Sequence, residues 1–296
     1  MRLRLERLPV RCPLCAVPAP PAALVKAGYP IARCACGMMF VSRPVEEHVL
    51  ESLYAEHYFA GGLDDGVPGY SGYADDERIL QRNFARRLRA LERLVTPGAL
   101  LDVGCALGFF VRVARQRGWD ACGVDRSAYA AGQAAARGVP VVHGDFLTAP
   151  FAPAGLAAVT MLDVLEHVAD PRAYVRRARG LLRPGGVLLV ETGDVGSLFA
   201  RLSGRHYHFF SPPNHLSFFT RATLGRLLGE EGFPEVAFHR VGKWVRVRQV
   251  LYHLHGRARR PAVKRALRAA VTSRLARVPI LLNLGDDLLA LARAAR

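Results

Sequence analysis

The 296-residue sequence contains no apolar run that reaches the ~18 residues needed to cross a bilayer, so we expect no transmembrane helix. Its start, MRLRLERLPVRC, has no long apolar segment and no cleavage site, which predicts that there is no signal peptide. Internal repeats and low-complexity tracts are absent. With 51% hydrophobic and 22% charged residues the composition is that of a globular protein, and we expect a cytoplasmic location.

Lysine is scarce, since it supplies three of the 41 basic residues, and acidic residues number only 25. A codon bias towards arginine and alanine would explain the shortage of lysine, but it would not explain where the charge lies. Residues 240–296 hold 14 basic and two acidic side chains, so +12 of the net charge of +16 is found there.

The six cysteines are concentrated near the start of the chain, where four of them form two close pairs. Such clustering without a signal peptide indicates metal binding before disulfides. Eighteen residues separate the pairs, a spacing typical of a tetrahedral four-thiolate zinc site, although the second pair is C-x-C instead of C-x-x-C. The alternative is four unliganded thiols. The predicted ligands are Cys12, Cys15, Cys34 and Cys36.

Apolar strands and helical segments alternate from about residue 96 to residue 242, which predicts a doubly wound α/β fold with a parallel sheet. Glycine follows the first strand in LDVGCALGFF (101–110). This segment matches D-x-G-x-x-x-G, with Asp102, Gly104 and Gly108. It lacks the dinucleotide fingerprint G-x-G-x-x-G, because Ala106 holds the second glycine position, and an NAD site is therefore disfavoured.

Acidic residues end the next two strands, and the carboxyl ends of such strands are where ligands bind. Asp125 is placed to accept hydrogen bonds from ribose hydroxyls. Asp145 is placed to accept a hydrogen bond from the adenine amino group, while Phe146 packs on the adenine ring. A single aspartate at a strand end is more often a helix cap, but suitable residues at three successive strand ends together indicate a binding site.

The segments LDVGCALGFF, GVDRS, HGDFL, LDVLEHVADP and LLRPGG together resemble the motifs of class I S-adenosylmethionine-dependent methyltransferases, over roughly residues 96–242. The resemblance implies a Rossmann-like seven-stranded sheet and S-adenosyl-L-methionine (SAM) as cofactor. Tyr58 and Tyr73 are further candidates, either to close over the ligand or to pack under a lid. The expected cofactor-binding residues are Asp102, Gly104, Cys105, Gly108, Asp125, Arg126, Asp145, Phe146, Leu162, Asp163, Tyr58 and Tyr73.

The cysteine module followed by this domain is also similar to bacterial sugar and natural-product methyltransferases, in which the zinc is structural. Those sugar enzymes are longer, so their substrate does not carry over. The chain is divided into a Cys₄ module (1–45), a helical and aromatic lid segment (46–95), a methyltransferase domain (96–242) with an acceptor loop (196–219), and a basic helical tail (243–296).

Histidines in two segments are the candidate general bases. His215 lies in the long aromatic acceptor loop and is the first choice, and His167 in L-E-H-V is the second. The alternative for each is a structural residue or a helix cap.

The basic tail is expected to form two amphipathic helices, the second over residues 281–295. The apolar stripe of the first is Val263, Leu267, Val271, Leu275 and Val278. Three roles are then open for the tail. It could be a helical cap docked on the domain, a segment that makes a peripheral contact with an anionic membrane surface, or a segment that binds nucleic acid. Nucleic acid is disfavoured because the tail lacks a basic groove interleaved with aromatic residues.

The sequence thus favours a methyltransferase that acts on a small molecule such as a sugar, a polyketide-like metabolite or a lipid-linked metabolite. Two alternatives are an RNA methyltransferase and a non-catalytic zinc-containing scaffold with a degenerate methyltransferase fold. The intact Asp102, Gly104, Gly108, Asp125 and Asp145 argue against degeneration.

Overall fold

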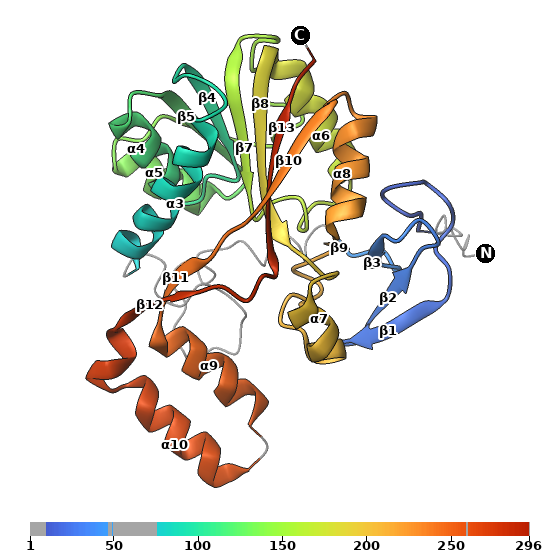
Figure 1. Cartoon of the computed structure of the whole chain (residues 1–296), viewed down its shortest axis with the longest axis vertical. Helices are drawn as coiled ribbons and strands as arrows, with labels where there is room; N and C mark the ends of the chain where they lie inside the picture. Colours follow the sequence, from blue (N-terminus) through green and yellow to red (C-terminus); the bar gives the residue numbers. More distant parts are fainter. Residues whose placement is uncertain (1–9, 47–48, 50–75, 259, 296) are drawn as a thin grey trace, which may run out of the picture.

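The computed structural model describes residues 10–46, 49, 76–258 and 260–295, and its centre is a seven-stranded sheet (Figure 1). All neighbouring strands run parallel except at β13, which pairs antiparallel with both of its neighbours. In spatial order the strands are β10 (Glu235–Arg240), β13 (Asp287–Arg293), β8 (Leu182–Gly193), β7 (Leu156–Leu162), β4 (Ala99–Val103), β5 (Asp120–Asp125) and β6 (Val141–His143).

Helices cover both faces of this sheet, which confirms the predicted doubly wound α/β fold (Figure 1). One face carries α3 (Glu77–Leu91), α4 (Phe109–Gln116) and α5 (Ala128–Ala136), and the other carries α6 (Pro171–Leu181) and α8 (Arg221–Glu230). The central strands are apolar throughout because each face is buried: Leu101 and Leu100 of β4 belong to two different core clusters. Ser127 caps α5 as predicted, since its Oγ accepts the N–H of Ala130 at 3.3 Å.

The N-terminal cysteine module forms a second, small sheet that includes part of the acceptor loop. Its strands are β1 (Ala22–Lys26), β2 (Tyr29–Arg33), β3 (Met39–Val41) and β9 (Ser217–Phe218). Strand β9 pairs antiparallel with β3 and comes directly after His215 and Leu216. The same loop contains α7 (Leu198–Ser203) and the short helix η1 (Gly204–His206).

The prediction of a helical tail is wrong for its second half. The first part contains β11 (Lys243–Arg246), α9 (Val247–Arg257), α10 (Pro261–Val271) and η2 (Arg274–Arg277), and the chain then continues as β12 (Pro279–Leu282) and β13. Residues 281–295 were expected to be a helix, but β13 lies between β10 and β8 and is almost completely buried. A central position in the sheet requires an apolar segment, and its run of leucine and alanine satisfies that requirement as well as it would a helix.

Buried charged residues join the tail to the sheet. Arg87 of α3 is 2% exposed and donates from Nε and Nη2 to the two carboxylate oxygens of Glu191, each at 2.7 Å. Nζ of Lys243 lies 3.3 Å from Glu191, 3.4 Å from Asp163 and 3.1 Å from Asp287. Burial opposes ionisation of Glu191, but Lys243 and Arg87 lower its pKa to about 2. We call these five residues the ion cluster.

We predict that Arg87→Met lowers the free energy of unfolding by about 3 kcal/mol. Breaking a buried pair leaves an uncompensated charge, and Lys243 keeps the loss at the lower end of the usual range. Urea denaturation followed by circular dichroism measures the change. Arg89→Met is the control, because Arg89 is on the same helix and exposed. Equal stability of the two variants would remove Arg87 from this role.

Candidate functional site

The carboxyl ends of the parallel strands β4, β5, β7 and β8 meet at one end of the molecule (Figure 1). The turn after β4 is shaped by residues in the left-handed region, with φ of +67° at Gly104, +48° at Ala106 and +77° at Gly108. A Cβ at Gly104 would lie 2.9 Å from a methyl carbon of Val164, and one at Gly108 would lie 2.9 Å from a methyl carbon of Val139. Glycine is therefore required at both positions for backbone conformation and for close packing.

Asp125 at the end of β5 organises this turn. Its Oδ2 accepts the N–H of Ala106 and its Oδ1 accepts the N–H of Ser127, both at 2.8 Å. Burial raises the pKa of Asp125, and the two amide hydrogen bonds counter that effect. Each carboxylate oxygen has a second lone pair, so the two oxygens together can also accept hydrogen bonds from two adjacent hydroxyl groups. This arrangement fits the ribose of an adenosyl ligand.

Other predicted cofactor residues lie at or beside this edge. Asp145 follows β6 and its Oδ1 accepts the N–H of Leu147 at 2.8 Å, as in a turn. Arg126 directly follows Asp125, and its side chain is exposed. Leu162 ends β7, and Asp163 has a left-handed φ of +53°, which is strained for a residue with a side chain.

Three predicted cofactor residues are instead buried in the interior. Asp102 is 3% exposed and accepts a hydrogen bond from Oγ1 of Thr160 at 2.6 Å, and burial raises its pKa to about 7. The ring of Phe146 is 2% exposed and packs on Tyr174 with 5.4 Å between centroids. Cys105 is 4% exposed and packs against β5. The contacts of these three side chains are with the core, and a role for them in cofactor binding stays a prediction.

Tyr58 and Tyr73 belong to the predicted lid segment and lie outside the described residues.

The two candidate bases lie together, with 4.7 Å between the ring centroids of His167 and His215. Nδ1 of His167 is 2.8 Å from the carbonyl oxygen of Asn214, and Nδ1 of His215 is 2.7 Å from that of Phe209. A carbonyl only accepts, so each Nδ1 carries the proton and each Nε2 has the lone pair. Burial lowers the pKa of both rings, that of His215 well below its ordinary value. Both imidazoles are therefore neutral at physiological pH.

Glu166 completes this group. It is fully buried, Oγ1 of Thr192 donates to its Oε2 at 3.0 Å, and its Oε1 has no hydrogen-bond partner among the described residues. Burial raises the pKa of Glu166 well above its ordinary value, and the charge of Asp163 adds to the effect. The three donor groups lie within 4.8 Å of one another, so they could share a proton or one cation.

Sequence reasoning missed the ion cluster beside this site. Arg87 and Glu191 are 104 residues apart in the sequence. Lys243 follows still later, and its contact with Glu191 depends on the tail returning to the sheet. Glu191 lies near the end of β8, and an acid directly after the apolar run VLLV was the one available signal.

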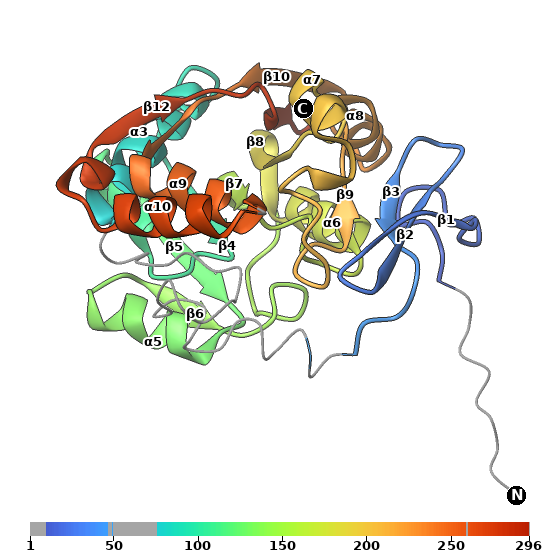
Figure 2. The same cartoon turned by 90° about the horizontal axis from the view of Figure 1, so that it is seen from below.

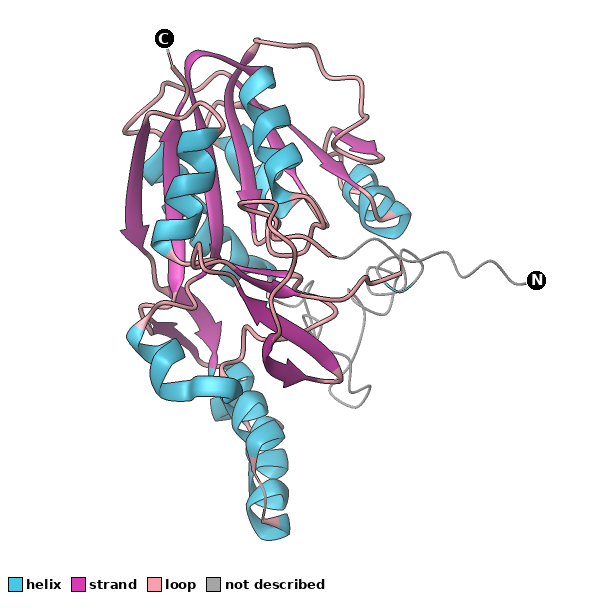
Figure 3. Cartoon of the chain, turned by 90° about the vertical axis from the view of Figure 1, so that its right-hand side faces the viewer, coloured by secondary structure: helices cyan, strands magenta, loops and turns pink. Residues whose placement is uncertain are grey.

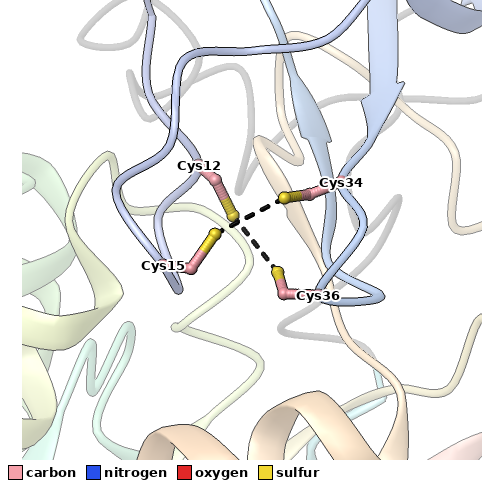
Figure 4. A group of neighbouring side chains, drawn as sticks. All are labelled: Cys12, Cys15, Cys34 and Cys36. Atoms are coloured by element: carbon pink, nitrogen blue, oxygen red, sulfur yellow. Dashed lines mark hydrogen bonds between the residues drawn. The ribbon is translucent and has the colours of Figure 1, made fainter.

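The four N-terminal cysteines converge from two loops (Figure 4). Sγ of Cys12 is 3.6 Å from that of Cys36, and Sγ of Cys15 is 3.4 Å from that of Cys34. These distances exceed a disulfide bond of about 2.05 Å, and they suit four thiolates about 2.3 Å from one Zn²⁺. The donor set fits a structural zinc ion, since four cysteines leave no open position for a substrate.

Comparison with known proteins identifies the domain. A family model described as a methyltransferase domain matches residues 75–237, more than half of the chain. The ubiquinone biosynthesis O-methyltransferase of Azorhizobium caulinodans is 32% identical over 170 residues, which cover 52% of this chain and 66% of that protein. An uncharacterized methyltransferase of Mycobacterium tuberculosis is 35% identical over 103 residues, which cover 33% of this chain and 52% of that protein. The chain thus spans between about half and two thirds of the length of these relatives.

Solved structures agree on the fold. A SAM-dependent methyltransferase from Archaeoglobus fulgidus aligns with a TM-score of 0.51 at 16% identity, over 75% of this chain and 98% of that one. Another from Thermotoga maritima aligns with a TM-score of 0.50 at 20% identity, over 75% of this chain and 93% of that one. At these identities the likeness concerns the fold. With more than half of its length matched by the family model, the chain belongs to the methyltransferase-domain family and has the Rossmann-like fold of SAM-dependent methyltransferases.

Proposed function

We propose that this protein is an enzyme that transfers a methyl group from SAM to a small-molecule acceptor by direct in-line displacement. The observation that carries the proposal is the turn held by Asp125, whose carboxylate fixes the backbone after β4 and keeps acceptor lone pairs for a ribose. The left-handed residues of the turn support it, because strained backbone conformations concentrate at functional sites.

When bound, SAM supplies an electrophilic methyl group on a positively charged sulfur. The protein then needs to hold the acceptor in line with that methyl group, and to accept a proton if the attacking atom carries one. Asp163 and His167 follow β7, which is separated from β5 and Asp125 only by β4. The ring of His215 lies against that of His167, so the proposed base is at the edge where an acceptor would have to sit.

For the acceptor we propose a sugar, a polyketide-like metabolite or a lipid-linked metabolite. The acceptor loop is rich in aromatic side chains, and Tyr207, Phe209 and Phe210 are buried in it. The similarity to ubiquinone biosynthesis O-methyltransferases supports a small organic acceptor over a macromolecule.

We propose His215 as the general base, with His167 and Glu166 as its partners. The neutral ring of His215 has its lone pair on Nε2, and the hydrogen bond to Phe209 fixes the orientation of the ring. A buried imidazole is a weak base, but Glu166 and His167 lie close enough to share the captured proton with it.

We also propose one structural zinc ion in the cysteine module. The contacts between the four Sγ atoms support this proposal.

The first prediction concerns the cofactor. Asp125→Ala should weaken SAM binding by about 1.5–3 kcal/mol, the range for lost hydrogen bonds to a charged group. Isothermal titration calorimetry measures it. Asp120→Ala is the matched control, because Asp120 begins the same strand and its side chain is 87% exposed. Unchanged affinity in Asp125→Ala would exclude this carboxylate from the site.

The second prediction concerns zinc. Elemental analysis of protein prepared without chelators should find one zinc per chain, and Cys34→Ser should lose it. Cys122→Ser is the control, since Cys122 lies in β5 and outside the cluster. Stoichiometric zinc in the Cys34→Ser protein, or none in the unmodified protein, would contradict the assignment.

The third prediction concerns the base. His215→Ala should lower kcat by at least about tenfold, as removal of a general base does, while SAM affinity stays within about twofold. Release of S-adenosylhomocysteine with an accepted substrate measures turnover. The control is His206→Ala, an exposed histidine of the same loop. If both variants turn over alike, His215 is a structural residue.

A further inference from the structure

Exposed apolar side chains gather on a few segments at one end of the molecule. Among the described residues the three most exposed large apolar side chains are Leu202 at 80%, Leu275 at 75% and Leu198 at 72%. Leu198 and Leu202 are one helical turn apart on α7, and exposed Arg201 lies between them in sequence. A single exposed leucine is ordinary on a protein surface. Three leucines that are each more than 70% exposed, on two segments, indicate a surface that contacts something else.

The second of these segments follows the hairpin of α9 and α10. Residues 247–285 contain nine basic and no acidic residues. Helix α10 has no buried residue, and Lys264 and Arg265 are exposed on it. The hairpin projects beyond the end of the sheet at which the parallel strands terminate (Figures 1 and 3), and α7 lies at that end too.

Basic and apolar side chains alternate after α10. From Arg274 to Val278 four of the five residues are exposed, and only Ala276 is buried. Leu275 thus stands between Arg274 and Arg277, and Val278, which is 45% exposed, follows Arg277. A surface on which cationic and apolar side chains lie side by side suits the boundary between the headgroups and the acyl chains of a bilayer.

We propose that α7, α10 and η2 form a surface that binds an anionic phospholipid bilayer, and we call it the docking surface. Its charge is of one sign and complements acidic headgroups. The exposed leucines favour a bilayer over a nucleic acid, because phosphate contacts gain nothing from them and single-strand binding uses aromatic platforms instead. None of the described helices is long and apolar enough to span a membrane, so the contact is peripheral.

The position of the docking surface bears on the acceptor, and this step rests on the proposed function. The view in Figure 2 looks at the end of the molecule where the hairpin and the carboxyl ends of the strands lie. The hairpin of the docking surface and the carboxyl end of β5, where Asp125 lies, are therefore at the same end of the molecule. This geometry favours a lipid-linked acceptor among the classes proposed above.

The test is co-sedimentation of the full chain with vesicles of phosphatidylcholine alone or mixed with phosphatidylglycerol. We expect binding to the mixed vesicles that weakens as salt is raised, and little binding to phosphatidylcholine. The double variant Arg274→Glu/Arg277→Glu should lower the partition coefficient at least about tenfold. Leu275→Ser should lower it several-fold without a change of charge.

The matched control is Arg93→Glu/Arg183→Glu, which changes the charge equally on two exposed arginines near the opposite end of the sheet. It should bind vesicles like the unmodified protein. Equal loss in both double variants would mean that net charge alone acts, and it would overturn the docking surface. Binding to a single-stranded RNA but not to mixed vesicles would also overturn it. Calorimetry with SAM on the same variants separates the two proposals, since a failure to bind SAM leaves the vesicle result unaffected.

Discussion

The ion cluster, in which Glu191 binds both Arg87 and Lys243, is the constraint on which the arrangement of the site depends. It joins a helix before the sheet, a central strand and the start of the tail through contacts of 2.7 to 3.3 Å. Arg87 and Glu191 are both buried, and either charge alone would be desolvated without compensation. The cluster therefore holds the carboxyl ends of β7 and β8 in one position, and Asp163 is held with them.

Backbone hydrogen bonds connect the cysteine module to the segment that holds the proposed base, although the proposed metal site itself has no open position for a substrate. Strand β3 pairs with β9, and the N–H of Leu216, the residue after His215, donates to the carbonyl oxygen of Glu166 at 2.7 Å. The N–H of Val41 in turn donates to the carbonyl of Leu216. A folded module thus fixes one end of the acceptor loop, and through it the proposed zinc ion would help to position the proposed base.

Local features of the sequence predicted most of the Rossmann-like part. The strand DACGVD and the cap Ser127 were readable because strand composition and capping act over a few residues. The strand β13 was not, because an apolar run of leucine and alanine is compatible with a helix until its partner β8 is known, and that partner lies about a hundred residues earlier. The burial of Phe146 and the pairing of Lys243 with Glu191 likewise follow from the assembled fold and not from the neighbouring residues.

The central claim is that the edge organised by Asp125 holds the adenosyl group. A crystal structure of the protein grown with S-adenosylhomocysteine tests it most directly. The account predicts the ribose hydroxyls within hydrogen-bond distance of the Asp125 carboxylate and the sulfur beside the turn at Gly104. Ligand bound elsewhere, or a carboxylate that still contacts only Ala106 and Ser127 while the ligand occupies the edge, would contradict it.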